Sequence, residues 1–233
     1  MRLVDGIRAI AFDLDGTLVD SAPDLAAAAN AMLATLGYAS LPERRIALAI
    51  GDGVERLVAA VLAQSEGQEP KPAALATATE VFRRHYAERL FDRSRVYPGV
   101  VDGLRTLAGR GLGLCCVTNK ASAFAEPLLE AAGLARFFAF ACCADRAEQR
   151  KPAPDLLLAA CERLDAHPGE LLYVGDSRTD IATARAARCR VAVVDYGYNR
   201  GQPLADASPD WIVGSIADIA ELPAAMPVSN GAL

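Results

Sequence analysis

Residues 12–20 read FDLDGTLVD, and this stretch decides the fold. The five residues before it, Ile7 to Ala11, are mostly apolar, which is typical of a strand buried on both faces of a sheet. Asp13 and Asp15 follow with one residue between them, so in an extended chain both side chains point to the same side. Two carboxylates this close repel each other unless a cation lies near them. The stretch therefore predicts a buried strand that ends in a polar site.

The composition is that of a globular protein and excludes several classes of function. The chain has 233 residues, of which 52% are hydrophobic and 23% are charged, and its net charge is -5. This charge, without any basic cluster, argues against a nucleic-acid partner. No apolar run approaches the roughly 20 residues that span a bilayer, and Asp5 and Arg8 interrupt the N-terminus where a signal peptide would be apolar. We expect a cytoplasmic protein without a membrane partner, either a monomer or a homodimer.

The six cysteines are expected to be small hydrophobic residues in a reducing compartment. Four of them form the adjacent pairs 115–116 and 142–143 inside apolar segments, and Cys161 and Cys189 are isolated. No CxxC motif is present, and neither histidine is paired with a cysteine. The cysteine pattern therefore indicates no metal or redox site.

Segments typical of strands and of helices alternate along most of the chain, which predicts an α/β fold with a parallel sheet covered on both faces. We expect strands at 8–14, 112–118, 137–142, 170–175, 190–194 and 211–213, and helices at 99–109, 121–132, 153–164 and 178–188. Such folds bind ligands at the carboxyl ends of their strands.

Residues 20–95 interrupt this alternation. They contain only helical stretches, separated by Gly and Pro, at 24–36, 43–49, 53–64 and 72–90. We therefore expect a helical domain inserted after the first strand, with hinges at 19–22 and 92–97. Residues 225–233 are expected to form a frayed tail.

Three further polar segments lie at or beside predicted strand ends. Thr118-Asn119-Lys120 offers a hydroxyl and an amide to an anion, and Lys151 precedes Pro152 at the start of a helix. Gly175-Asp176-Ser177-Arg178-Thr179-Asp180 carries a second pair of carboxylates. Parallel strands bring their carboxyl ends to one edge of a sheet, so acid, hydroxyl and cation are expected to meet there.

Each segment alone also has a purely structural interpretation. Asp-Gly-Thr at 15–17 is a common turn sequence. The 175–180 segment is compatible with the N-cap of helix 178–188, with Asp176 or Ser177 as the cap residue. Four such segments, each beside a predicted strand end, favour a site.

Together the four segments resemble the motifs of the haloacid dehalogenase superfamily of phosphoryl-transfer enzymes. The matching stretches are 13–18, Thr118, Lys151 and 175–180. The resemblance implies a Rossmann-like parallel-sheet core, here residues 1–18 and 96–233, with an inserted all-helical cap domain, here residues 19–95.

The resemblance also implies roles for these residues. Asp13 is expected to attack phosphorus and form an aspartyl-phosphate, and Asp15 to act as general acid and base. Thr118, Asn119 and Lys151 are expected to hold the transferring phosphoryl group.

A metal ion is implied as well. Mg²⁺ is expected to be held by Asp13, the backbone carbonyl of Asp15, and Asp176, with Asp180 supporting the metal from behind or through water. A metal and a lysine would supply the positive charge that phosphoryl transfer needs.

The acid at position 15 favours phosphate esters over halide chemistry, because a halide leaving group needs no proton. Stretches 12–25, 50–53, 173–181 and 196–199 further resemble the phosphoglycolate phosphatase branch of the superfamily. The implied substrate is 2-phosphoglycolate, a small phosphate monoester. A phosphatase of N-acetylmuramic acid 6-phosphate, a β-phosphoglucomutase-like mutase and a regulatory binding module remain alternatives.

Residues of the predicted cap have two interpretations each. Asp52 departs from the Gly-Asn-Gly more usual in this branch, and it either caps helix 53–64 or faces the site, where it would disfavour an anion. Arg56 either pairs with a substrate carboxylate or is a surface arginine. Tyr198 and Asn199 either line the pocket or serve a turn.

Overall fold

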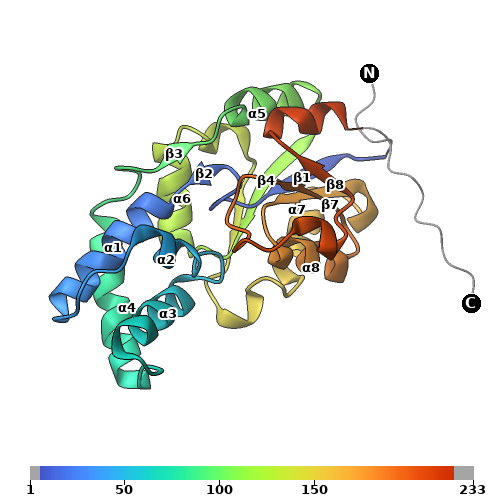
Figure 1. Ribbon diagram of the computed structural model, residues 1–233. Coiled ribbons are helices and arrows are strands. Elements are labelled where there is room, and N and C mark those ends of the chain that lie inside the picture. Colours follow the sequence, from blue (N-terminus) through green and yellow to red (C-terminus); the bar gives the residue numbers. More distant parts are fainter. Residues whose placement is uncertain (1–5, 223–233) are drawn as a thin grey trace, which may run out of the picture.

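The computed structural model describes residues 6–222 and has the predicted α/β fold, built on a six-stranded parallel sheet (Figure 1). The strand order is β5-β4-β1-β6-β7-β8. These strands are β1 (Ala9–Phe12), β4 (Gly113–Thr118), β5 (Ala141–Cys143), β6 (Leu171–Gly175), β7 (Arg190–Val194) and β8 (Trp211–Val213). The expected tail at 225–233 lies outside the described residues.

Helices cover both faces of the sheet. Helices α5 (Val100–Gly109) and α6 (Ser122–Ala131) contribute to the apolar cluster on one face, and α7 (Asp155–Arg163) and α8 (Arg178–Ala187) contribute to that on the other. Side chains of β1 alternate between the two clusters, because successive residues of a strand point to opposite faces. Burial on both faces explains why the strands are apolar throughout.

The order of the strands places a crevice beside β1. The chain runs outward from β1 through β4 to β5, and outward in the other direction from β6 through β7 to β8. Phe12 of β1 is in register with Cys116 of β4 and with Val174 of β6. The segments after these strands therefore leave the sheet at one edge, where doubly wound sheets bind ligands.

Residues 22–87 form a helical block with an apolar cluster of its own (Figure 1). Its helices are α1 (Ala22–Thr35), α2 (Glu43–Ala47), α3 (Val54–Glu66) and α4 (Pro72–Ala87). Met32, Val58 and Phe82 are fully buried where α1, α3 and α4 meet. The four predicted helices are all present, and their ends differ by a few residues from the predicted ones.

Two short strands join the helical block to the sheet. β2 (Val19–Asp20) and β3 (Arg95–Val96) pair antiparallel within the segments predicted as hinges. Beside them the buried Asp24 carboxylate accepts hydrogen bonds from the backbone N–H groups of Arg93 and Ser94, at 2.8 and 2.9 Å, and from the Ser94 hydroxyl at 2.5 Å. The outgoing and returning connections are therefore tied to each other. The sequence analysis did not predict this ribbon, because two-residue strands have no hydrophobic periodicity.

The edge strand β5 was predicted to begin too early in the chain, at 137–142 rather than Ala141–Cys143. A 3₁₀ turn at Ala135–Phe137 precedes it, and Phe137 and Phe138 pack against the cluster on the α5–α6 face. The first apolar residues of the predicted strand therefore pack in the core ahead of β5 and do not belong to the sheet.

All six cysteines are free thiols, five of them buried, as the sequence indicated. Among residues 6–222, no helix combines the length and apolarity needed to cross a membrane.

Candidate active site

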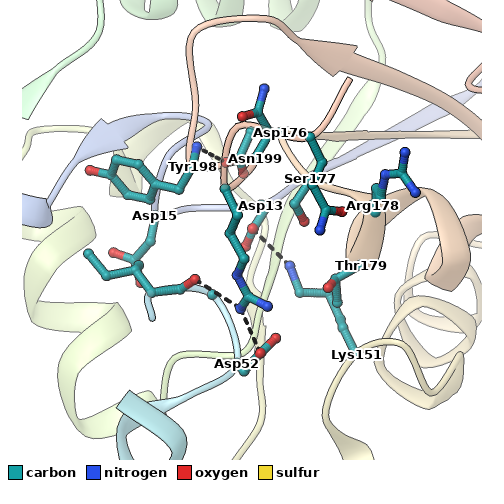
Figure 2. A pocket seen from close by; sticks show the side chains of 14 residues that line it. Asp13, Asp15, Asp52, Lys151, Asp176, Ser177, Arg178, Thr179, Tyr198 and Asn199 are labelled. Carbon is teal, nitrogen blue, oxygen red and sulfur yellow. Dashed lines mark hydrogen bonds and ion pairs between the residues drawn. The ribbon is translucent and has the colours of Figure 1, made fainter. Parts of the chain in front are cut away.

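Asp13 follows β1 directly and is 7% exposed. The Lys151 ammonium lies 2.8 Å from Asp13 Oδ2 (Figure 2). It also lies 2.7 Å from Asp180 Oδ1 and donates a hydrogen bond of 2.9 Å to the Tyr173 hydroxyl. Burial raises the pKa of Asp13 to about 6, although Lys151 opposes the rise. Burial also opposes the charge on Lys151, but Asp13 and Asp180 together raise its pKa above the usual value. The pair places a fixed cation beside a buried carboxylate.

Asp176 is positioned by close backbone approach after β6. Its carboxylate accepts a hydrogen bond of 3.0 Å from the Thr17 hydroxyl and one of 2.5 Å from the backbone N–H of Tyr198. A Cβ added at Gly16, where φ is +86°, would lie 2.5 Å from Asp176 Oδ2, and one at Gly197 would lie 2.2 Å from Asp176 Cβ. Only glycine fits at either position, so both glycines form the walls that hold this carboxylate.

Asp180 fixes other members of the site. Its Oδ2 accepts hydrogen bonds from the backbone N–H of Asp176 at 3.2 Å and from Ser177, through the N–H at 3.1 Å and the hydroxyl at 2.6 Å. Its Oδ1 faces Lys151 and accepts the Tyr173 hydroxyl at 3.0 Å. Burial alone would raise the pKa of Asp180, but Lys151 and these hydrogen bonds lower it below the usual value.

The interpretation of the 175–180 segment as the N-cap of a helix is also correct, with Ser177 as the cap residue. Ser177 is the N-cap of α8 and forms a capping box with Asp180, while Asp176 lines the cavity. A Cβ at Gly175 would lie 2.4 Å from Asp180 Cβ, so the glycine before the cap is needed for this approach. A single segment therefore starts the helix and supplies site carboxylates.

Three carboxylates meet in a geometry that suits a divalent cation. Asp13, Asp176 and Asp180 each offer an oxygen, and these oxygens lie within 4.8 Å of one another. Burial, followed by repulsion from Asp180 and Asp13, raises the pKa of Asp176 well above its usual value, so the cluster lacks positive charge. Hard oxygen donors fit Mg²⁺. Asp13 and Asp176 border the first cavity, whereas Asp180 is fully buried behind them and is bound to Lys151 and Ser177, so Asp13 and Asp176 are the better-placed ligands.

Asp15 has different partners from Asp13. Its two carboxylate oxygens lie 3.0 and 2.9 Å from the Lys120 ammonium, and the Ser21 hydroxyl donates to Oδ1 at 2.6 Å. Lys120 is 5% exposed, and its ammonium lies 4.8 Å from the centroid of the Tyr86 ring. Sequence reasoning marked the strand end at 118–120 but gave Lys120 no role. The one indication in the sequence was a lysine two residues after the end of a buried strand.

Thr118, the last residue of β4, and Asn119, which follows it, were both predicted to bind phosphate, but their side chains have different surroundings. Thr118 is 1% exposed and lines a cavity together with Asp13. The Asn119 amide donates to the carbonyls of Gly51, at 2.9 Å, and Lys151, at 3.3 Å, and its Oδ1 accepts the Lys151 N–H at 2.7 Å. Both side-chain N–H groups are thus engaged with backbone. The Asn119 side chain therefore holds the Lys151 loop and the 50–53 loop in place.

The loop before α3 forms a wall of the site. Asp52 lines the cavity with Asp13, and its Oδ2 lies 2.6 Å from Nη2 of Arg200 (Figure 2). The N-cap of α3 is Gly53 and receives no side-chain cap, so the capping interpretation of Asp52 is wrong. Arg56 is exposed and borders a separate outer groove, so the structure does not bring it into the site. The sequence could not reveal the Asp52–Arg200 pair, because its members are 148 residues apart.

Tyr198 and Asn199 both line the cavity, as one of their two interpretations predicted. The Tyr198 hydroxyl donates to Asp20 Oδ1 at 2.5 Å and accepts the Ala22 N–H at 2.9 Å, so Tyr198 also links the sheet to the start of α1. Asn199 accepts the Gly201 N–H at 2.9 Å, which is turn chemistry. For Asn199 both interpretations hold.

Two adjoining cavities open from Asp13 and Asp15. The first, of about 70 Å³, is bordered by Lys151, Asp176 and the Asp52–Arg200 pair. The second, of about 30 Å³, extends beneath the helical block. Its lining comprises Asp13, Asp15, Leu25, Ile50, Gly51, Gly53, Val54, Leu57, Thr118, Asn119 and Lys120.

Comparison with known proteins agrees with this geometry. Residues 7–188 match the model of the haloacid dehalogenase-like hydrolase family. The phosphoglycolate phosphatase of Thiobacillus denitrificans is 45% identical over 214 residues, which cover 92% of this chain and 94% of the relative. That of Nitrosospira multiformis is 45% identical over 216 residues, covering 93% and 95%. The crystal structure of a predicted phosphoglycolate phosphatase from Haemophilus somnus matches with a TM-score of 0.88 and 33% identity, covering 93% of this chain and 97% of that one.

The chain therefore belongs to the haloacid dehalogenase-like hydrolase family. Relatives named as phosphatases align over nearly its whole length, and the buried acidic cluster and its lysine lie at the crevice of the same fold. Within the family, the enzyme is a phosphatase.

Proposed function

We propose that this enzyme is a Mg²⁺-dependent phosphatase that hydrolyses 2-phosphoglycolate to glycolate and phosphate through an aspartyl-phosphate on Asp13. The observation that carries the proposal is the unequal environment of two neighbouring carboxylates. Asp13 faces Lys151, at 2.8 Å, whereas Asp15 is held by Lys120 and Ser21. Carboxylates in distinct surroundings can take distinct chemical roles at one pH. The names of the relatives supply the substrate.

In the first step the Asp13 carboxylate attacks phosphorus. The bond from phosphorus to the glycolate oxygen breaks, and Asp15 donates a proton to that oxygen, so glycolate leaves as an alcohol. Lys151 counters the combined negative charge of nucleophile and phosphate. The Thr118 hydroxyl, which borders the same cavity as Asp13, is placed to hold a phosphoryl oxygen.

In the second step Asp15 takes a proton from a water molecule that attacks the phosphorus of the aspartyl-phosphate. The bond between phosphorus and the Asp13 oxygen breaks, inorganic phosphate is released, and Asp13 regains its carboxylate. Asp15 is then protonated again and ready for the next substrate. Proton and charge balance over the cycle, and no further reactant is required.

Mg²⁺ would be held by Asp13, the backbone carbonyl of Asp15, and Asp176. When bound, it supplies positive charge to the phosphoryl oxygens. The chain contributes the fixed orientation of these ligands. Thr17 and Tyr198 hold Asp176, and Asp180 holds Lys151 and the turn that carries Asp176.

The size of the site supports a small substrate. Cavities of about 70 and 30 Å³ provide room for a phosphoryl group and a leaving group of few non-hydrogen atoms, since about 10–15 Å³ of such cavity volume holds one water molecule. An N-acetylmuramic acid or hexose leaving group is far larger. This favours 2-phosphoglycolate over the sugar phosphates among the alternatives.

We further propose that residues 19–95 act as a cap on a core formed by residues 1–18 and 96–233. Polar contacts join the two parts over the site: Arg200 to Asp52 and to the Ile50 carbonyl, Asn119 to the Gly51 carbonyl, and Arg150 to Glu55 at 2.8 Å. Their release would let the cap turn about the β2–β3 ribbon and admit substrate, while their formation would exclude water during transfer.

The test is phosphate release from a panel of monoesters with and without Mg²⁺, with Asp13→Asn as the blank. The panel contains 2-phosphoglycolate, N-acetylmuramic acid 6-phosphate and several hexose phosphates. The proposal predicts a dominant kcat/KM for 2-phosphoglycolate that needs Mg²⁺ and vanishes in the blank. Preference for a sugar phosphate would refute the substrate, and full activity of Asp13→Asn would refute the mechanism. Phosphate release that requires an added sugar bisphosphate would point to the mutase.

A further inference from the structure

The second cavity has an asymmetric lining. Four apolar side chains form its wall on the side of the helical block: Leu25, Ile50, Val54 and Leu57. On the side of the sheet lie Asp13, Asp15, Thr118, Asn119 and Lys120. Among these lining residues Lys120 carries the single positive charge, and it is 5% exposed. A buried cation beside an otherwise apolar wall is costly unless it serves a polar partner.

Lys120 has a hydrogen-bond donor to spare. An ammonium group has three N–H donors, and the two recorded hydrogen bonds of Lys120 Nζ both go to Asp15. Lys151, by contrast, has three partners for its ammonium: Asp13, Asp180 and the Tyr173 hydroxyl. The Tyr86 ring lies 4.8 Å from the Lys120 ammonium, and its buried hydroxyl donates to no acceptor among the described residues. This corner of the site is therefore supplied with donors beyond those that the chain itself uses.

The two cavities share Asp13 and Asp15 but differ in their other charged groups: Lys151 and Asp176 border the first, and Lys120, the partner of Asp15, borders the second. Asp13 and Asp15 both border it, and a leaving group must lie on the far side of phosphorus from Asp13 and within reach of Asp15. In 2-phosphoglycolate the carboxylate is separated from the leaving oxygen by one carbon atom. A phosphoryl group at Asp13 with its leaving oxygen at Asp15 therefore places that carboxylate within a few ångströms of the group that binds Asp15.

We infer that Lys120 is a specificity residue that binds the carboxylate of the leaving group directly, so that the second cavity selects phosphate esters carrying an anionic group close to the ester oxygen. This inference rests on the proposed function and assigns the part of the chain that recognises the substrate. The four apolar side chains of the wall offer no hydrogen-bond partner to a neutral hydroxyl, whereas a carboxylate gains a charge-assisted hydrogen bond from Lys120. Lys120 thereby takes the role that one of the two interpretations gave to Arg56.

The test compares two esters of nearly equal size, 2-phosphoglycolate and 2-hydroxyethyl phosphate, in which a neutral CH₂OH replaces the carboxylate. The measured quantity is the ratio of their kcat/KM values. Loss of a hydrogen bond to a charged group lowers such a ratio by roughly ten- to a hundredfold. Lys120→Gln removes the charge but keeps a donor for Asp15, and it should lower the ratio by this amount. Lys120→Arg restores the charge and should retain most of the preference.

Ser21→Ala is the matched control. Ser21 also holds Asp15, at 2.6 Å, but it is neutral and does not line the cavity. Loss of the Ser21 hydroxyl should slow hydrolysis of both esters alike and leave the ratio of their kcat/KM values unchanged. If Lys120 only positioned Asp15, Lys120→Gln would leave the ratio unchanged in the same way. Inhibition by glycolate gives a second readout, because Lys120→Gln should raise its inhibition constant by a similar factor.

The outcomes separate the two proposals. A wild-type enzyme without preference for 2-phosphoglycolate would overturn the proposed substrate and this inference with it. A wild-type preference that persists in Lys120→Gln, together with unchanged inhibition by glycolate, would overturn the inference alone. A ratio that falls in Lys120→Gln but not in Ser21→Ala is the expected result.

Discussion

Asp24 offers a sharp test of how the helical block is fastened to the sheet. Its carboxylate, 1% exposed, is the acceptor for the Arg93 and Ser94 N–H groups and for the Ser94 hydroxyl. Asp24→Asn preserves the shape but replaces one acceptor oxygen by an NH₂ group. In either orientation that NH₂ group faces an N–H donor, so at least one hydrogen bond is lost and the others lose their charge.

The expected cost follows from these bonds. A hydrogen bond to a charged group contributes about 1.5–3 kcal/mol, and a buried donor left without a partner costs about 1–3 kcal/mol. Ser94 is fully buried, so water cannot replace the lost acceptor there. We expect Asp24→Asn to lower the free energy of unfolding by about 2–4 kcal/mol, and the melting temperature by roughly 5–15 °C for a chain of this size.

The assay is equilibrium unfolding in urea, followed by circular dichroism, with Asp102→Asn as the matched control. Asp102 pairs with Arg105 at 2.7 Å, but their side chains are 78% and 63% exposed, so its loss should cost less than about 0.5 kcal/mol. Equal stability of the Asp24 and Asp102 variants would refute the reasoning. It would mean that the connection between sheet and helical block carries little of the folding free energy.

Three more predictions concern the site. Millimolar Mg²⁺ should raise the melting temperature of the wild type but not of Asp176→Asn, and an equal rise in both would exclude Asp176 as a ligand. Gly197→Ala should lower kcat/KM by about a hundredfold, because its Cβ would lie 2.2 Å from Asp176 Cβ; wild-type activity would contradict the glycine wall. Asp52→Asn breaks the half-exposed ion pair with Arg200, so it should lower the free energy of unfolding by less than about 1 kcal/mol. It should nevertheless speed proteolysis within 19–22 and 92–97, and unchanged cleavage would speak against a closing cap.

The sequence predicted the sheet and the edge that carries the site, because both depend on local patterns. Apolar strands buried on two faces read as continuous runs, and Asp13 and Asp176 stand out directly after two of them. Strand register then brings these two carboxylates together without further information. The helices of the inserted block were equally visible, because each is bounded by Gly or Pro.

The pairings between distant residues were beyond sequence reasoning. Nothing local indicates that Lys120 meets Asp15, 105 residues away, or that Arg200 meets Asp52. The place of Arg56 at the outer groove could not be foreseen for the same reason, since a position one turn into a helix does not say which face of that helix meets the cavity. Partner choice across the cavity depends on the closure of the helical block over the sheet, which no single segment encodes.

The identity of the nucleophile is the central claim, and it can be tested by chemical trapping. The enzyme is mixed with Mg²⁺ and 2-phosphoglycolate, quenched during turnover, and treated with borohydride, which reduces an aspartyl-phosphate to homoserine. Peptide mass spectrometry then locates the change. Homoserine at position 13, formed only with substrate and absent from Asp13→Asn, is the predicted result. Modification of another residue instead, or phosphate release by Asp13→Asn at the wild-type rate, would contradict the mechanism.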